Sequence, residues 1–547
     1  MKALWGTAVA VIAAGALSFA APASATTFCV PTFSEGCPDS NGNQAAASLQ
    51  IALNTAGSDG SADIVRLAPG THSRDGAFTA VGSDELTIVG TGRTETIITS
   101  TATTAGAVLN LYSGNTRKIT VRDLQVVVPA SFPNSGGVGS ALIQSNDTIE
   151  RVDIVSKNSQ ANGVTSIIQG GTFRDVRFFG RAGGRFGYAL GNPAGDNCPN
   201  APYTLVADDV SIQDSSMGIT ADCPKVEAKV TDVITRGVGT SIYLQGGARM
   251  TMRNALFESG DGSPIQVLNS TDDGDTELRA SHVTAIATGD ETAPAIHARV
   301  PNLTLTDDVR VRIDSSAFVG FESTWFAEAA DDPQKGDSYL EISYSNYAVP
   351  GTKSGNSYVT VGPGNVDVAP RFVDPAAGDY RPASGSSLID AGRPTVDPPD
   401  TDLAGNPRPV DGNGDGTAVP DAGAFEYQLP DPNCETDPSL CPDPTDPANP
   451  DTTKPRITKV RFSFKRGKGG RLRMNVSERS RIRVVFKPKP KGERKPVTIV
   501  RNVKAGTVRI KLGKRKLKPG AYRLRLVATD EAGNRSNPVT RKVKVRR

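Results

Sequence analysis

Short runs of alternating apolar and polar residues recur through the first two-thirds of the chain. A repeat of about 20 to 50 residues is typical of stacked structural units, and runs this short and rich in β-branched residues favour strands over helices. The runs begin at Asp123, Arg151, Asp175, Asp209, Asp232, Asn254, Ser281, Ser315 and Tyr344, with gaps of 28, 24, 34, 23, 22, 27, 34 and 29 residues. The pattern therefore predicts a parallel β-helix.

Strand alternation resumes in a smaller C-terminal segment. Residues 429–455 are dense in Pro and Asp, which predicts a semi-rigid linker. The segment 456–547 then shows short alternating runs separated by turn residues, which predicts a small β-sandwich. Its strands are expected at 457–464, 471–476, 481–486, 497–500, 507–512, 522–528 and 540–545.

The N-terminus and the cysteines predict export. Residues 1–25 have the charge, the short apolar stretch and the small-residue cleavage site of a secretory signal peptide, and the stretch is too short to span a membrane. The six cysteines allow fifteen pairings, of which the nearest in sequence are Cys29–Cys37, Cys198–Cys223 and Cys434–Cys441. A zinc site is the alternative, but the chain has no Cys-x-x-Cys and only three histidines. We expect disulfides and a secreted, extracellular protein, with retention at the cell surface left open.

The formal net charge of +3 hides a strong asymmetry between the two parts of the chain. Residues 454–547 carry 33 Lys and Arg against 4 Asp and Glu, whereas residues 1–453 carry 28 against 54. Such a basic block favours an anionic partner, here an acidic polysaccharide or another cell-envelope polymer. A second interpretation is that the basic charge only keeps this segment soluble. Nucleic acid is the least favoured partner, because the protein is expected outside the cell.

Two stretches that flank the repeats resemble known exported proteins. An apolar helical face over Gln44–Ala56, followed by Ala62–Thr71, is similar to the N-terminal cap and first strand of pectin-lyase-like β-helix proteins. The C-terminal stretches resemble bacterial β-helix proteins of the "choice-of-anchor" type, and they comprise Pro370–Pro375, Gly378–Arg381, Ser387–Gly392, Thr401–Arg408 and Asp421–Tyr427. The resemblance implies a right-handed β-helix over residues 26–428 and export, but no single activity. Separately, Pro519–Asn534 resembles the closing strands of immunoglobulin-like or fibronectin-type domains.

Catalysis is a second functional hypothesis, because extracellular β-helices also resemble pectate lyases, alginate lyases and polygalacturonases. The polygalacturonase-like Gly-His-Gly and Asn-Thr-Asp-Gly signatures are absent from the chain. Arg185 and Tyr188, in a Gly-rich insertion, and His282, inside a repeat run, are weak catalytic candidates. A hydrogen bond within the coil stack is the commoner role for a histidine placed like His282. No complete catalytic constellation is identified.

Calcium is the only cofactor that the sequence suggests. Asp411, Asn413 and Asp415, followed by Gly416, match the start of an EF-hand-like loop. The twelfth position is Ala422 instead of an acidic residue, so an ordinary Asp/Asn/Gly turn stays open. The acidic run 272–275 is a second calcium or sugar candidate, with solvated turn residues as its alternative.

The preferred hypothesis is an exported surface protein that binds carbohydrate or an anionic envelope polymer. Its β-helix would present a polar side to glycans, and its basic sandwich would hold it to the envelope. The alternative is a polysaccharide lyase or glycoside hydrolase that acts on acidic polysaccharide. A structural spacer, whose acidic and basic parts attract one another between molecules, is a third and weaker hypothesis.

Overall fold

The computed structural model divides into two compact units, which are residues 1–369 with 422–424, and residues 370–421 with 425–547. The predicted domain boundaries stay predictions. The structure describes residues 25–545 except 40–41, 57–60, 81, 83, 104–105, 112–117, 132–139, 145–146, 159–161, 167–169, 181–185, 192–202, 261, 290–291, 302–303, 395–400, 430–454, 466–468, 478–479, 490–496, 504–505, 513–516, 530–535 and 537.

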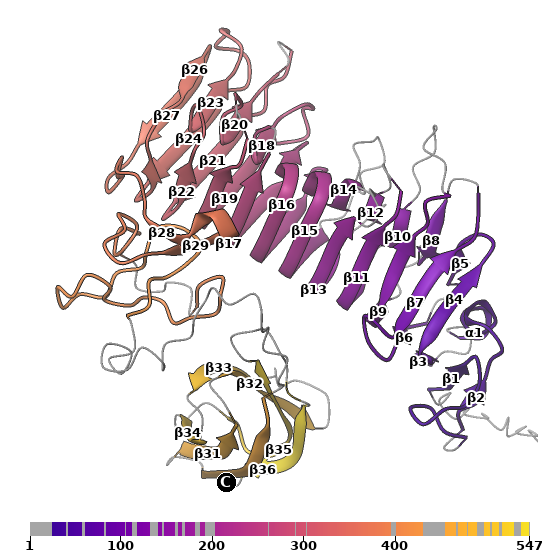
Figure 1. Cartoon of the computed structure of the whole chain (residues 1–547). Helices are drawn as coiled ribbons and strands as arrows, with labels where there is room; N and C mark the ends of the chain where they lie inside the picture. The colour runs from indigo at the N-terminus through magenta and orange to yellow at the C-terminus, as the bar shows by residue number, and fades with distance from the viewer. Residues whose placement is uncertain are drawn as a thin grey trace, which may run out of the picture. The chain divides into compact units, whose positions relative to one another are not determined.

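The first unit is a parallel β-helix, as predicted, in which each strand pairs in parallel with the corresponding strand of the next coil (Figure 1). Its strands are β1 (Thr27–Val30), β2 (Gln44–Ala45), β3 (Asp63–Leu67), β4 (Gly70–Arg74), β5 (Phe78–Thr79), β6 (Leu86–Val89), β7 (Thr96–Ser100), β8 (Ala107–Asn110), β9 (Ile119–Val128), β10 (Ser140–Gln144), β11 (Thr148–Ser156), β12 (Asn162–Ser166), β13 (Gly171–Gly180), β14 (Phe186–Gly191), β15 (Tyr203–Asp222), β16 (Val226–Gln245), β17 (Arg249–Ser259), β18 (Ile265–Leu268), β19 (Thr276–Ala287), β20 (Ile296–Arg299), β21 (Val309–Asp314), β22 (Ala317–Val319), β23 (Trp325–Glu328), β24 (Ser338–Ser343), β25 (Asn346–Tyr347), β26 (Thr352–Ser354) and β27 (Ser357–Val361).

In the part of the chain that the structure describes, nine coils turn a corner at a single residue with left-handed backbone. The corner residue itself has no partner in the strand pairing, whereas the residues on either side of it do. Around the corners at Arg151 and Asp175, for example, Glu150 pairs with Arg174 and Val152 pairs with Val176. The corner residues have φ between 49° and 59° and are Asp123, Arg151, Asp175, Asp209, Asp232, Asn254, His282, Ser315 and Tyr344. The runs seen in the sequence therefore begin at these corners, with one correction: the corner is His282 and not Ser281.

The interior of the β-helix is filled by apolar side chains stacked in register from coil to coil. One inward row consists of Ile88, Val121, Ile149, Phe173, Ala207, Val230, Met252, Ala280, Ile313 and Ile342, all of which are buried. Each coil thus buries its apolar face only against its neighbours, which is the physical reason for the repeat.

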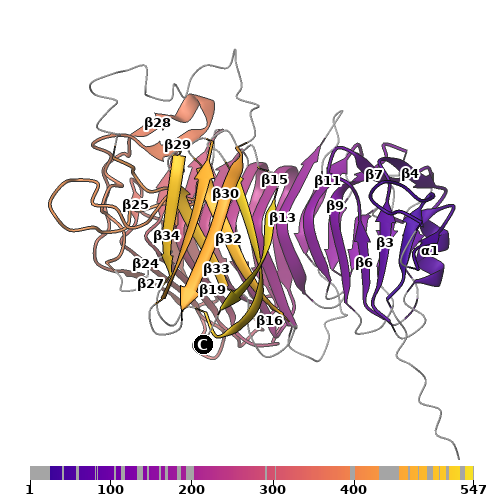
Figure 2. The same ribbon diagram turned by 90° about the horizontal axis from the view of Figure 1, so that it is seen from below.

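A short helix closes the N-terminal end of the β-helix. Helix α1 (Leu49–Thr55) buries Leu49, Ala52 and Leu53, and Figure 2 shows it beyond β3 at that end. It is shorter than the predicted helix 44–56, because Gln44–Ala45 pairs with β1 as a strand and the Ser48 side chain caps the helix start. The predicted Cys29–Cys37 disulfide is confirmed in the same region.

The second unit contains a two-stranded pair and a seven-stranded β-sandwich. The pair is β28 (Phe372–Asp374) and β29 (Asp379–Pro382), joined through the 3-10 turn η1 (Pro375–Ala377). The sandwich strands are β30 (Ile457–Lys465), β31 (Gly469–Val476), β32 (Ser480–Lys489), β33 (Val497–Val503), β34 (Gly506–Leu512), β35 (Gly520–Thr529) and β36 (Val539–Val545). The sheet orders are β30-β31-β34 and β33-β32-β35-β36. All seven predicted strands are present, each ending within three residues of its expected bounds.

No helix among the described residues is long and apolar enough to cross a membrane.

Candidate functional sites

The predicted catalytic residues are not brought together in the described part of the chain. Arg185 lies outside the described residues, and Tyr188 lies half-buried on β14. His282 occupies a corner four coils further on, so strand spacing alone separates it from Tyr188 by about 19 Å. His282 is 2 % exposed, and neither ring nitrogen has a hydrogen-bond partner within the described residues. The ring is therefore buried and does not lie on a surface where substrate would bind.

The corner position of His282 gives a stability prediction. In the preceding coil, the Asn254 amide donates a hydrogen bond to Asp232 across 3.1 Å. We expect His282→Asn to raise the free energy of unfolding by about 0.5–1 kcal/mol, because Asn tolerates left-handed backbone and the unpaired ring nitrogens are removed. Urea denaturation of both proteins measures the difference. A less stable variant would contradict this, since the lost imidazole volume would then dominate.

The acidic residues near 272–275 connect neighbouring coils. The Asp272 carboxylate accepts the Thr306 backbone N–H at 2.7 Å, and Asp275 accepts that of Asp308 at 3.0 Å. Asp308 in turn accepts the Asp337 N–H at 2.8 Å. The backbone hydrogen bond from Thr306 lowers the pKa of Asp272 against a smaller opposing effect of desolvation. These carboxylates therefore take part in coil stacking.

The candidate calcium loop is held by its own backbone. Asp411 accepts the N–H groups of Gly414 at 2.8 Å and Gly416 at 2.9 Å, and Asn413 accepts that of Asp415 at 2.8 Å. These are the hydrogen bonds of Asx-type turns. Within the described residues, no group of three His, Cys, Asp or Glu side chains is placed to hold a metal ion. The structure thus gives no convergent set of carboxylates here, and calcium binding stays a prediction.

A buried ion pair with two further carboxyl groups organises part of the second unit, and we call Arg408, Asp402, Asp421 and Glu426 the Arg408 cluster. The Arg408 Nε and a Glu426 oxygen are 3.0 Å apart, and both side chains are fully buried. Glu426 also accepts the backbone N–H of Val410 at 2.7 Å. Desolvation raises the pKa of Asp402 to about 6, of Asp421 to about 7 and of Glu426 to about 8.

The Arg408 cluster lies in the stretches that resemble the anchor type, Thr401–Arg408 and Asp421–Tyr427. Its carboxylates accept main-chain N–H groups, such as Glu426 N–H to Asp402 at 2.9 Å and Asp390 N–H to Asp421 at 2.7 Å. We interpret these stretches as a structural centre, because their charged side chains are buried against backbone.

One row of positions across β15, β16, β18, β20 and β23 carries polar side chains that the sequence did not indicate, with Leu268 between the two polar pairs. Gln245 donates to Asp222 at 2.6 Å, and Tyr243 donates to Gln245 at 2.9 Å. Desolvation raises the pKa of both Asp222 and Tyr243. Further along, Arg299 Nε lies 3.2 Å from a Glu328 oxygen. Sequence reasoning missed this row because the spacing between coils varies, so the register between coils was not known.

The row does not supply paired carboxylates for glycoside hydrolysis. Asp222 lies on β15 and Glu328 on β23, with β16, β18 and β20 between them in the sheet. Four strand spacings separate the two by about 19 Å. The acid pairs of retaining and inverting hydrolases are about 5–9.5 Å apart. Asp222 and Glu328 therefore do not form such a pair.

Each outer face of the sandwich carries three cations side by side, and we call these sets the two cation rows. Arg461, Arg473 and Arg509 lie opposite one another on β30, β31 and β34, and all three are exposed. On the other sheet, the exposed residues Lys487, Arg523 and Lys542 lie opposite one another on β32, β35 and β36.

Like charges directly opposite on neighbouring strands destabilise a sheet, because their Cβ atoms are only about 4.5–5.5 Å apart. The described residues of the sandwich include no acidic side chain to offset these charges. The four acids of this segment, Glu478, Glu493, Asp530 and Glu531, all lie outside the described residues. The two cation rows are therefore surfaces suited to an external polyanion.

Of the four cysteines in the other two predicted disulfides, the structure describes only one. Cys223 is disulfide-bonded, whereas Cys198, Cys434 and Cys441 lie outside the described residues. The pairs Cys198–Cys223 and Cys434–Cys441 thus stay predictions.

No protein-family profile and no curated protein matches the chain. Among solved structures, ORF18 of Geobacillus virus E2 is similar at 12 % identity and a TM-score of 0.29, over 58 % of this chain and 56 % of that one. The gp42 tailspike of Acinetobacter phage vb_AbaP_AS12 is similar at 12 % identity and a TM-score of 0.28, over 87 % of this chain and 76 % of the tailspike. This chain therefore spans little more than half of the ORF18 protein. Scores this low carry no argument about activity, and the β-helix rests on the strand pairing of the chain itself.

Proposed function

We propose that this protein is an exported β-helix protein whose basic sandwich binds an acidic polysaccharide or another anionic envelope polymer. The observation that carries the proposal is the pair of cation rows, in which Lys and Arg are directly opposed across three strands of each sheet. A polymer with regularly spaced negative charges would relieve this repulsion along a whole row. The Cys29–Cys37 disulfide supports export, because disulfides persist in oxidising compartments.

The test is binding of the mature chain to immobilised polygalacturonate and alginate over a series of salt concentrations. Two triple variants each remove one row: R461Q/R473Q/R509Q and K487Q/R523Q/K542Q. Each Lys or Arg near an anionic surface contributes about 1 kcal/mol, so losing three predicts about 100-fold weaker binding at low salt. We also expect wild-type binding to weaken steeply as salt rises, since exposed charges are screened.

A matched control removes the same charge from the β-helix. Arg253, Arg279 and Arg312 are exposed on its strands, and R253Q/R279Q/R312Q should change binding less than about twofold. If all three triple variants lost the same binding affinity, net charge alone would explain the loss. That result would contradict a binding site on the sandwich. Binding that is insensitive to salt, or undisturbed by either row variant, would also refute the proposal.

A further inference from the structure

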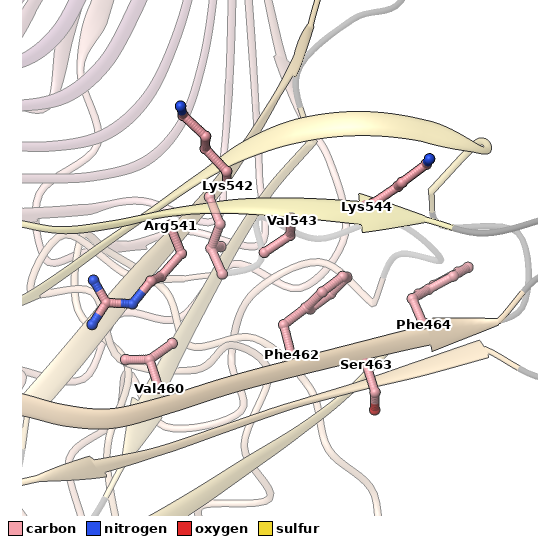
Figure 3. A pocket seen from close by; sticks show the side chains of 9 residues that line it. Val460, Phe462, Ser463, Phe464, Arg541, Lys542, Val543 and Lys544 are labelled. Carbon is pink, nitrogen blue, oxygen red and sulfur yellow. The ribbon is translucent and has the colours of Figure 1, made fainter.

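The β-sandwich is open along one side, where the edge strands of its two sheets face each other. In the described residues, β30 pairs only with β31 and β36 pairs only with β35, so each has one edge without a neighbouring strand in its sheet. A groove of about 580 Å³ lies between them (Figure 3). This volume is within the range of about 300–1,000 Å³ that ligand sites occupy.

The groove has an apolar floor. Figure 3 shows Phe462 and Phe464 extending from β30 toward β36, and Val543 extending from β36 toward them. Val460, Phe462 and Val543 are only half-buried although they pack against the sandwich core. Apolar side chains in this arrangement favour an occupant that covers them with apolar groups of its own.

The rim of the groove is cationic. Arg541, Lys542 and Lys544 are exposed on β36, and Figure 3 shows Lys542 and Lys544 pointing away from β30. An occupant therefore meets positive charge beside the apolar floor, and main-chain hydrogen-bonding groups along two strand edges.

We propose that this groove binds an extended acidic peptide, with alternating acidic and apolar residues, as an added strand. In a strand, successive side chains point to opposite faces, so the apolar residues would enter the groove while the acidic ones meet the rim. Its main chain would pair with an edge strand, as in other cases of β-strand addition. Charge complementarity selects the acidic peptide over a basic or neutral one.

Two occupants from the protein itself fit poorly. The linker 429–455 is acidic but rich in proline, which has no N–H to donate to a strand ladder. The sandwich of a second copy carries the same excess of positive charge, with 33 Lys and Arg against 4 Asp and Glu from residue 454 onward. Like charge on both partners opposes that pairing.

The test uses the full mature chain and a fluorescein-labelled peptide, Asp-Val-Glu-Ile-Asp-Val-Glu-Ile, with anisotropy as the readout. Three altered peptides separate the contributions: Lys for every acid, Ser for every apolar residue, and Pro for the central Ile and Val. We expect each altered peptide to bind at least about tenfold more weakly, because charge, apolar floor and main-chain pairing are each required.

Protein variants locate the site. K544E reverses one exposed rim charge and is expected to weaken binding at least about tenfold, and V543E places a charge in the groove. T498E adds one acid to the exposed opposite edge on β33, and we expect it to change binding less than about twofold.

The row variant R461Q/R473Q/R509Q should bind the peptide almost as wild type does, which separates this site from polymer binding. Equal binding of the Ser peptide would overturn the proposal, because charge alone would then explain the affinity. So would K544E and T498E behaving alike, or loss of peptide binding when the row of Arg461, Arg473 and Arg509 on the other sheet is removed.

Discussion

Replacing Arg408 by methionine is expected to lower the free energy of unfolding of its region by about 3–5 kcal/mol at pH 8. Removal of one partner of a buried pair leaves the other as an uncompensated buried charge, and here Glu426 and Asp421 both lose their cation. Hydrogen exchange of the backbone N–H groups of Val410 and Tyr427, which bind Glu426 and Asp421, measures the local loss.

The cost should depend on pH. Burial raises the pKa of Asp421 to about 7 and of Glu426 to about 8, whereas unfolded carboxyl groups titrate near 4. The native state then binds these protons more tightly, so their stabilising contribution is complete below pH of about 4 and is lost as pH rises through 7 and 8. At pH 5 the carboxyl groups are largely protonated, and R408M should cost clearly less than at pH 8.

The double variant R408M/E426Q is the control for the Arg408 prediction. It removes both charges of the pair while keeping an oxygen for the Val410 N–H, so it should be more stable than R408M alone. An R408M protein that loses less than about 1 kcal/mol, with no pH dependence, would show that the pair carries little of the local stability.

Replacing Phe173 by alanine is expected to cost about 3–5 kcal/mol in the coils around it. The Phe173 side chain is fully buried in the inward row, with Ile149 in one neighbouring coil and Ala207 in the other. The small Ala207 leaves room for the ring, so truncation would leave a cavity that rigid strands on both sides cannot close. Hydrogen exchange across β11, β13 and β15 should show the loss, and β24 should be nearly unaffected because coils contact only their neighbours.

A swap within the same row tests this explanation. Ala207→Phe alone should cost about 1–3 kcal/mol by overpacking. F173A/A207F keeps the volume of the row and moves the ring by one coil, so it should lose less than the two single changes combined. Strictly additive losses would contradict the view that the two positions share one packing space.

Much of the fold could be predicted from local pattern. The repeat runs begin at the corner residues Asp123, Arg151 and Asp175, because a polar residue in left-handed backbone between two apolar strands leaves a mark in the sequence. The run predicted to begin at Ser281 begins one residue later, at His282. Both residues are polar, so the sequence pattern does not show which of them takes the left-handed backbone. The sandwich strands were predictable for the same reason, since strict alternation over short runs reports which side of a strand is buried.

The candidate sites depend on contacts that local pattern does not show. The motif Thr401–Arg408 is visible in the sequence, but only the fold brings Arg408 to Glu426 and buries both charges. The cation rows were visible as composition, whereas their alignment across three strands depends on the pairing register. The groove between β30 and β36 was not predictable, because it depends on which strands form the edges of the two sheets.

The sequence by itself determined the β-helix, the seven sandwich strands and the charge asymmetry, because apolar periodicity and composition are properties of neighbouring residues. The tertiary structure decided which polar groups are buried, which cations are opposed and where an apolar surface stays open. Those properties come from residues distant in the chain, and their free energies depend on the distances and the burial that only folding sets.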